Sequence, residues 1–205
     1  MDEHQRKVLA AANQPHFNEN GLLNAQIPPE LAIQASMLQP SEQSFEAWMN
    51  SRVARKSTRS YDWNALKFQA DLDPRYRRAQ MRYMGTGATG VASDSNTVPS
   101  AHFTFSTMVI PGGGIGPMHI HYDVEEVFFV LRGQMKIICE KDGQRWEALL
   151  HERDLISVPP GVYREEINTG DEDALMCVML GTPKPITPTY PPDSALARIK
   201  RELGR

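Results

Sequence analysis

The chain has 205 residues, of which 40% are hydrophobic, so it can form one domain with a hydrophobic core and still carry an additional segment. Its formal net charge of -3 argues against general electrostatic binding to nucleic acid or to anionic lipid. The absence of an apolar run of about 18 residues, and of a signal-peptide pattern, predicts a cytoplasmic protein without a membrane segment. Cys139 and Cys177 lie in apolar runs and are expected to be buried free thiols.

Residues 1–95 are predicted to form an N-terminal extension. Residues 1–40 mix polar residues with prolines, which indicates an arm with short helical pieces. A helix is predicted over about 41–56, with Ser41 or Ser44 as its N-cap, because the apolar residues that follow have helical spacing. These residues are Phe45, Trp48, Met49 and Val53. Pro74–Met84 begins as a turn and ends as a strand, and the Gly- and Ser-rich segment 85–100 reads as a boundary loop or a flap.

From residue 101 onwards the pattern changes to successive strands, so residues 96–182 are predicted to form one all-β domain. Asp142-Gly143 marks a hairpin turn within 135–149. The strand that begins at Glu126 is apolar on both faces, with Phe128 and Val130 on the face of Glu126. A strand of this kind is covered on both sides, which predicts that the extension or a second subunit packs against it, and we expect a homodimer.

Residues 183–205 are predicted to form a proline-rich extended strap followed by a short amphipathic helix. The strap contains the sequence TPKPITPTYPP, whose prolines favour an extended backbone. Asp193 is the predicted N-cap of the helix, which carries Ala195, Leu196, Ile199 and Leu203 on its apolar side.

The segment that starts at Gly113 carries a group of potential metal ligands, with His119, His121 and Glu126 ahead of Gly133. Side chains two residues apart share one face of a strand, so the two imidazoles are expected to point to the same side. Glu126 stands an odd number of residues after His121, so an unbroken strand would turn it to the opposite face. A bend after His121 must therefore return Glu126 to the face of the two histidines. Two imidazoles and a carboxylate are a common ligand set for a divalent transition metal.

This spacing resembles the first motif of the cupin superfamily, and the resemblance covers about residues 100–182. The second motif is matched by Pro159, Gly161 and Asn168. It departs from the motif at Arg153, which replaces a glycine, and at Arg164, which replaces a metal-binding histidine. The resemblance implies an all-β jelly-roll barrel, here with a partly helical N-terminal extension and a short C-terminal helix.

The resemblance also implies that His119, His121 and Glu126 hold one divalent metal, expected to be Fe(II), with Mn, Ni or Zn as alternatives. Arg164 cannot be a ligand, and its charge beside a dication must be compensated. Glu166 could pair with Arg164 or become a ligand itself. Arg164 could instead anchor a carboxylate or phosphate of the substrate, or the metal could be absent and the pocket could bind an anion directly.

Other histidines are alternative replacements for the missing ligand. His102 and His151 carry no ligand spacing of their own, so a surface position is the favoured interpretation for both, and His102 is the better outside candidate.

The predicted function is a metal-dependent enzyme of the dioxygenase type that acts on a small anionic or aromatic metabolite, with Arg164 and Glu166 in catalytic roles. Two imidazoles and a carboxylate on Fe(II) leave positions open for substrate and O2. The same ligands on another metal could support isomerase or lyase chemistry. The alternative from another class is a non-catalytic cupin that binds or senses a small molecule.

Overall fold

The computed structural model describes residue 3 and residues 42–85 and 96–203 of the chain. The chain divides into two units, residues 1–43 and residues 44–205, and the second unit holds all the strands described below. The predicted arm over 1–40, apart from Glu3, and residues 86–95 of the predicted loop lie outside the described residues. None of the helices in the described ranges is long and apolar enough to cross a bilayer.

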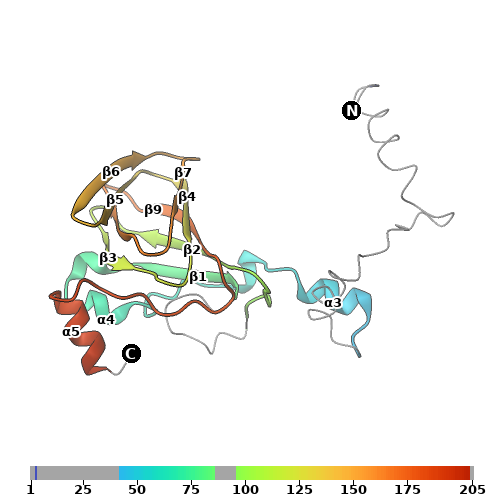
Figure 1. Cartoon of the computed structure of the whole chain (residues 1–205). Coiled ribbons are helices and arrows are strands. Elements are labelled where there is room, and N and C mark those ends of the chain that lie inside the picture. Colours follow the sequence, from blue (N-terminus) through green and yellow to red (C-terminus); the bar gives the residue numbers. More distant parts are fainter. Residues whose placement is uncertain (1–2, 4–41, 86–95, 204–205) are drawn as a thin grey trace. The chain divides into compact units, whose positions relative to one another are not determined.

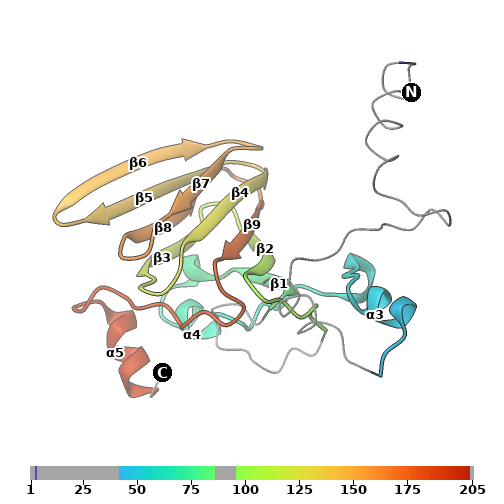
Figure 2. The ribbon, with the colours of Figure 1, turned by 45° about the vertical axis from the view of Figure 1, so that its right-hand side comes forward.

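The second unit is built on two antiparallel sheets that face each other (Figure 1). The five-stranded sheet has the order β1-β2-β9-β4-β7 and the four-stranded sheet has the order β3-β8-β5-β6. Figure 2 shows the strands of the second sheet lying side by side. The nine strands are β1 Ala79–Met84, β2 Thr104–Ile110, β3 Ile115–Ile120, β4 Glu126–Arg132, β5 Met135–Lys141, β6 Gln144–Leu150, β7 Leu155–Val158, β8 Tyr163–Asn168 and β9 Ala174–Leu180. The predicted all-β jelly-roll class is confirmed.

The core lies between the two sheets and follows the predicted alternation along β4. Phe128 and Val130 are buried on the same side as Glu126, whereas Val127 and Phe129 are only half-buried. The inner side chains of both sheets complete the core, with Ile110 and Met176 from one sheet and Met135 and Ile137 from the other among its members. The two-residue period therefore places Glu126 on the inner face of its sheet.

The segments on both sides of the predicted barrel pack against it. Strand β1 falls within the predicted extension 1–95, yet it pairs with β2 along most of its length. Ala65 and Leu66 belong to the same buried cluster as the barrel core. The C-terminal strap returns to the barrel at Tyr190, whose hydroxyl receives a hydrogen bond of 2.5 Å from Gln69 Nε2. The sheet thus extends into the segment before residue 96.

The helices are short. Helix α3 covers Phe45–Ser51, less than the predicted 41–56, and begins at Ser44, whose hydroxyl accepts a hydrogen bond from the Ala47 N–H. Two short elements follow it, α4 (Lys67–Ala70) and the 3-10 turn η2 (Pro74–Tyr76), and a further 3-10 turn, η1, covers Lys56–Thr58. None of the side chains of α3 is buried.

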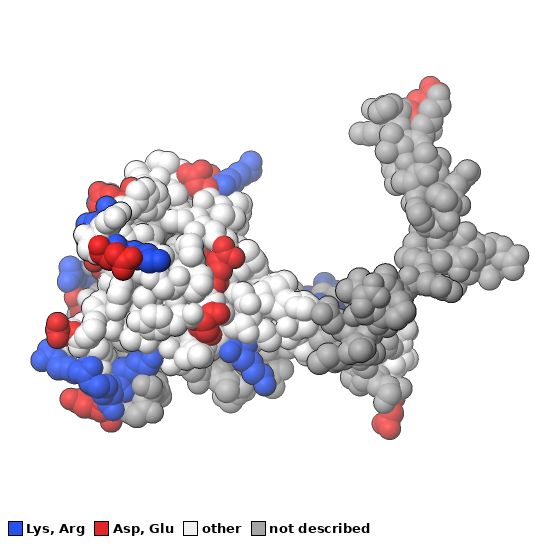
Figure 3. All heavy atoms as spheres, in the orientation of Figure 1, with Lys and Arg blue, Asp and Glu red and all other residues white. Residues whose placement is uncertain are grey.

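The C-terminal helix α5 covers Ala195–Glu202 and confirms the predicted short helix. The predicted Asp193 cap is wrong, because the hydroxyl of Ser194 accepts the capping hydrogen bond from the Ala197 N–H. Figure 3 shows positive and negative side chains intermixed on the visible face, with a group of Lys and Arg over this helix. Arg198, Lys200 and Arg201 are the basic residues of α5.

The predicted hairpin turn is confirmed between β5 and β6. Asp142 and Gly143 have φ values of 51° and 74°, which is the pair of positive angles that a tight two-residue turn requires. Arg153, at the position where the second motif expects glycine, has a φ of 72°. The backbone has therefore kept the left-handed conformation although the side chain has changed.

Replacing Arg153 with glycine is expected to stabilise the chain by about 0.5–1 kcal/mol, because the left-handed cost of about 1–2 kcal/mol exceeds the flexibility that glycine adds to the unfolded chain. The Arg153 side chain is exposed, so little packing is lost. Urea denaturation would measure the change. A loss of stability would show that the arginine side chain makes a favourable contact that outweighs the backbone strain.

Candidate metal centre

Three buried side chains converge inside the barrel at one end of β3 and β4. His119 belongs to β3, His121 follows it directly, and Glu126 is the first residue of β4. The Nε2 atoms of His119 and His121 lie 3.3 and 3.6 Å from the same Glu126 oxygen, Oε2. One potential ligand atom from each residue lies within 4.8 Å of the other two. The bend after His121 resets the alternation as predicted and turns Glu126 toward the imidazoles.

The hydrogen bonds of His119 test whether this cluster suits a cation. The Nδ1 atom lies 2.9 Å from the Pro117 carbonyl oxygen, which can only accept a hydrogen bond, so Nδ1 carries the proton. In the neutral ring Nε2 then presents its lone pair to Glu126 Oε2, 3.3 Å away. Two acceptors at this distance require either a second proton or a metal ion between them. A backbone carbonyl that fixes the imidazole tautomer is also typical of metal-binding histidines.

The electrostatics of the cluster leave His121 neutral and Glu126 ionised, the states in which these two side chains accept a cation, whereas His119 must release a proton to do so. Burial lowers the pKa of His121 to about 4, so this imidazole is neutral at pH 7. Burial would also lower the pKa of His119, but the carboxylates of Glu166 and Glu126 outweigh it and raise that pKa. Burial would raise the pKa of Glu126, but the hydrogen bond and charge of His119 keep it below its usual value. The residues therefore fit a divalent metal and could hold one.

A small cavity of about 50 Å³ opens on the cluster. His119, His121 and Glu126 form one part of its wall together with Phe128. Another part of the wall comes from before the predicted barrel boundary and includes Leu66, Gln69, Arg78 and Gln80. Neither Arg78 nor Gln80 was predicted to belong to the site. Their alternation with Ala79 and Met81 was the one available signal, because it gives the predicted strand a polar face.

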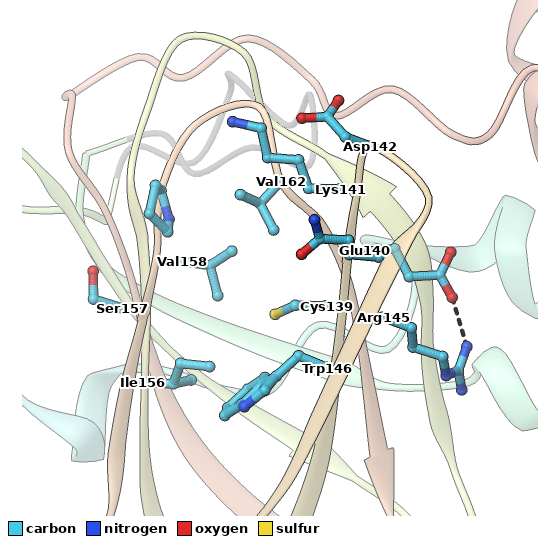
Figure 4. A pocket seen from close by; sticks show the side chains of 12 residues that line it. Cys139, Glu140, Lys141, Asp142, Arg145, Trp146, Ile156, Ser157, Val158 and Val162 are labelled. Carbon is cyan, nitrogen blue, oxygen red and sulfur yellow. Dashed lines mark hydrogen bonds and ion pairs between the residues drawn. The ribbon is translucent and has the colours of Figure 1, made fainter.

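A larger hollow of about 600 Å³ lies between the β5–β6 hairpin and β7. Figure 4 shows Cys139, Trp146, Ile156 and Val158 around it, and an ion pair of 2.5 Å between Arg145 and Glu140 at its edge. Among the described residues, the group of potential metal ligands lies on the smaller cavity instead. The smaller cavity is therefore the candidate site.

Comparison with known proteins agrees with this architecture. Residues 106–180 match the family model of the cupin domain. The chain contains a cupin domain. No curated protein sequence matches it.

Solved structures resemble the chain at low sequence identity. An oxalate oxidase structure aligns with a TM-score of 0.54 and 16% identity over 82% of this chain and 79% of its own. Peruvianin-I, a cysteine peptidase from Thevetia peruviana latex, aligns with a TM-score of 0.52 and 15% identity over 72% of this chain and 79% of its own. At these identities the likeness concerns the fold alone.

The second cupin motif supports the site through its backbone. Gly161 has a φ of 79° and donates its N–H to the His121 carbonyl oxygen over 2.8 Å, which fixes the backbone of one candidate ligand. Asn168 is 1% exposed, and its amide donates to the carbonyl oxygens of Ile110 and Glu172. Asn168 therefore connects the end of β8 to the end of β2 and to the loop before β9.

Arg164 occupies the position where the cupin motif has a metal-binding histidine, opposite His119 on the adjacent strand. It is fully buried, and its Nη2 donates to the carbonyl oxygens of Val158 and Pro159 over 3.4 and 3.2 Å. Its Nε lies 3.7 Å from Glu126 Oε2. The guanidinium thus compensates the charge of Glu126. Arg164 itself is not among the residues that line the small cavity.

Glu166 lies on the same face of β8 as Arg164 and is 2% exposed. Burial raises the pKa of Glu166 to about 7, so this carboxyl can carry a proton near neutral pH. It lines the cavity, although it does not belong to the ligand cluster found among the described residues. His102 and His151 are exposed and also stay outside that cluster.

Gly116 makes room for the Glu166 carboxylate, because a Cβ at this position would overlap Glu166 Oε2. The Gly116→Ala change is therefore expected to displace Glu166 and to lower the free energy of unfolding by about 1–3 kcal/mol through overpacking. Urea denaturation of the Gly116→Ala and Gly116→Ala/Glu166→Ala variants would measure it. If the second change fails to recover stability, the carboxylate is not the obstacle.

Proposed function

We propose that the chain is a metal-dependent cupin enzyme, and that it is a dioxygenase-type oxidoreductase that uses Fe(II). The observation that carries the proposal is the convergence of two buried imidazoles on one carboxylate oxygen, with the Nε2 atoms of His119 and His121 at 3.3 and 3.6 Å from it. Two histidines and one carboxylate leave open positions on iron, which is the arrangement of non-haem Fe(II) oxygenases. The likeness to an oxalate oxidase is consistent with oxidative chemistry on this fold.

The residues have separate roles in this proposal. His119, His121 and Glu126 hold the metal, which when bound would supply Lewis-acid and O2 chemistry. Phe128, with Met108 and Met176, gives the cavity apolar walls that exclude bulk water. Glu166, whose pKa burial raises to about 7, can hold or release a proton beside the substrate.

The size of the cavity favours a small anionic substrate over an aromatic one. Ligand pockets commonly measure about 300–1,000 Å³. The cavity at the cluster measures about 50 Å³, which suits a ligand of a few heavy atoms. We therefore propose a small carboxylic acid as the substrate class.

Oxygen uptake by Fe(II)-loaded protein tests this function. The chain would be loaded anaerobically, transferred to air-saturated buffer and mixed in turn with glycolate, oxalate, pyruvate and catechol. Uptake that requires one of the acids and is lost in His121→Ala would support the proposal. Loss of an acid without oxygen uptake, followed by NMR, would indicate lyase or isomerase chemistry instead. A chain that takes up no metal when supplied with Fe, Mn, Ni or Zn would be a non-catalytic binder.

We further propose that the protein is a homodimer. The outer face of β4 remains partly uncovered by the described residues, with Leu131 on β4 41% exposed. Leu155 on β7 is 55% exposed and lies opposite Phe129, so these side chains form one apolar strip. Light scattering on the full chain would test this, and a monomer at micromolar concentration would contradict it.

A further inference from the structure

We propose that Arg78, from the segment before the matched cupin domain, binds the carboxylate of a small anionic ligand beside His119, His121 and Glu126. This inference rests on the proposed function, because it assumes a metal at His119, His121 and Glu126. It adds the residue that would recognise the substrate. Arg164 was the sequence-based candidate for this role. The geometry favours Arg78 because Arg78 lines the cavity and Arg164 does not, although Nε and Nη1 of Arg164 also have no hydrogen-bond partner among the described residues.

Arg78 is a buried cation with donor capacity left over. Its side chain is 5% exposed, and its Nη1 donates to the Ile115 carbonyl oxygen over 3.1 Å. That bond fixes the guanidinium against β3, the strand that carries His119. The buried Nε has no hydrogen-bond partner among the described residues. A guanidinium held in this way can donate to a carboxylate oxygen with little further loss of side-chain freedom.

Other residues that line the cavity also carry buried polar atoms without partners among the described residues, which indicates a polar occupant. Gln69 Oε1, His121 Nδ1 and Glu166 Oε1 are also buried without a partner among the described residues, and all three residues line the cavity with Arg78. Buried polar atoms in folded proteins nearly always have partners. Four such residues around one small cavity therefore indicate a polar occupant that can both donate and accept hydrogen bonds.

The formal charges favour an anion once a metal is present. With Glu126 and Glu166 both ionised, their two negative charges balance the two positive charges of Arg78 and Arg164, and with Glu166 protonated these four buried side chains sum to +1. A divalent metal adds two positive charges to this group. Uncompensated charge is costly in a buried site, so a carboxylate beside Arg78 and the metal would be stabilised relative to a neutral ligand of equal size.

Calorimetry with acetate and acetamide tests the inference. The two probes have nearly the same shape, fit a cavity of this size and differ in charge. Wild type, Arg78→Gln, Arg78→Lys and Arg77→Gln would each be titrated after Mn(II) loading and after metal removal, with metal content and melting temperature measured on the same samples. Arg77 is the matched control, since it is exposed and lies over the Trp63 ring at 4.5 Å.

The loaded wild type is expected to bind acetate at least about tenfold more tightly than acetamide. Arg78→Gln should lose this preference and keep its metal, Arg78→Lys should keep part of it, and Arg77→Gln should equal wild type. Equal acetate affinity in wild type and folded Arg78→Gln would overturn the inference, as would a wild type that binds no acetate. Failure of the metal proposal would appear separately, as absent Mn(II) in wild type, and the metal-free titration would then decide the role of Arg78.

Discussion

Replacing His121 with alanine is expected to abolish stoichiometric metal binding, with a loss of affinity of more than about 100-fold. His121 supplies one of two imidazoles, and its side chain is buried against Glu126 Oε2 at 3.6 Å. Alanine leaves a single imidazole and one carboxylate, which do not hold a divalent ion against water. Elemental analysis of untagged protein, followed by competition with a chromophoric chelator, would measure the loss.

The matched control for this change is His151→Ala. His151 is exposed and stands outside the ligand cluster, so its removal should leave the metal content and the affinity unchanged. Circular dichroism would confirm that both variants are folded. Equal metal content in wild type and in folded His121→Ala would contradict the assignment of this histidine, and a metal content that falls only in His151→Ala would move the site elsewhere.

Replacing Arg164 with methionine is expected to have opposite effects on the metal-free and metal-loaded protein. In the metal-free chain Arg164 compensates the charge of Glu126, 3.7 Å from its Nε, and removing one partner of a buried ion pair costs about 3–5 kcal/mol. In the loaded chain the metal itself neutralises Glu126, and the positive charge of Arg164 repels the metal. The variant should therefore bind metal at least about tenfold more tightly than wild type.

Urea denaturation with a chelator would measure the first effect, and chelator competition the second. Arg145→Met is the control, because Arg145 is a half-exposed arginine in a surface ion pair with Glu140, and such a pair contributes about 0–1 kcal/mol. Arg164→His adds a possible fourth ligand and should bind metal more tightly still. If Arg164→Met weakens metal binding, the guanidinium supports the site in a way that charge repulsion does not describe.

Much of the site could be predicted because local patterns specify it. The alternation along β3 gave the shared direction of the two histidines, and the polar residues after His121 predicted the bend that returns Glu126 to them. The departure from the motif at Arg153 was visible in the sequence, but the left-handed backbone there, with a φ of 72°, is known only from the structure. Strand periodicity also gave the inner face of β4 correctly.

The remaining parts of the site depend on contacts between distant segments. Alternation predicted that Arg164 faces inward, but the carbonyl oxygens of Val158 and Pro159 determine where its guanidinium ends. Arg78 reaches the cavity because β1 pairs with β2, and no local pattern reports which strand will be its neighbour. Helix α3 is shorter than its apolar spacing suggested, since none of its side chains is buried and spacing alone does not extend a helix.

The part of the cavity wall that is formed by Leu66, Gln69, Arg78 and Gln80 lies outside the matched region 106–180. The three candidate metal ligands, His119, His121 and Glu126, lie inside that region. Under the proposed function, metal binding and recognition of the ligand would thus be carried by separate stretches of the polypeptide. Under the same proposal, laboratory evolution aimed at residues 65–80 would change which compounds bind while His119, His121 and Glu126 stay unaltered.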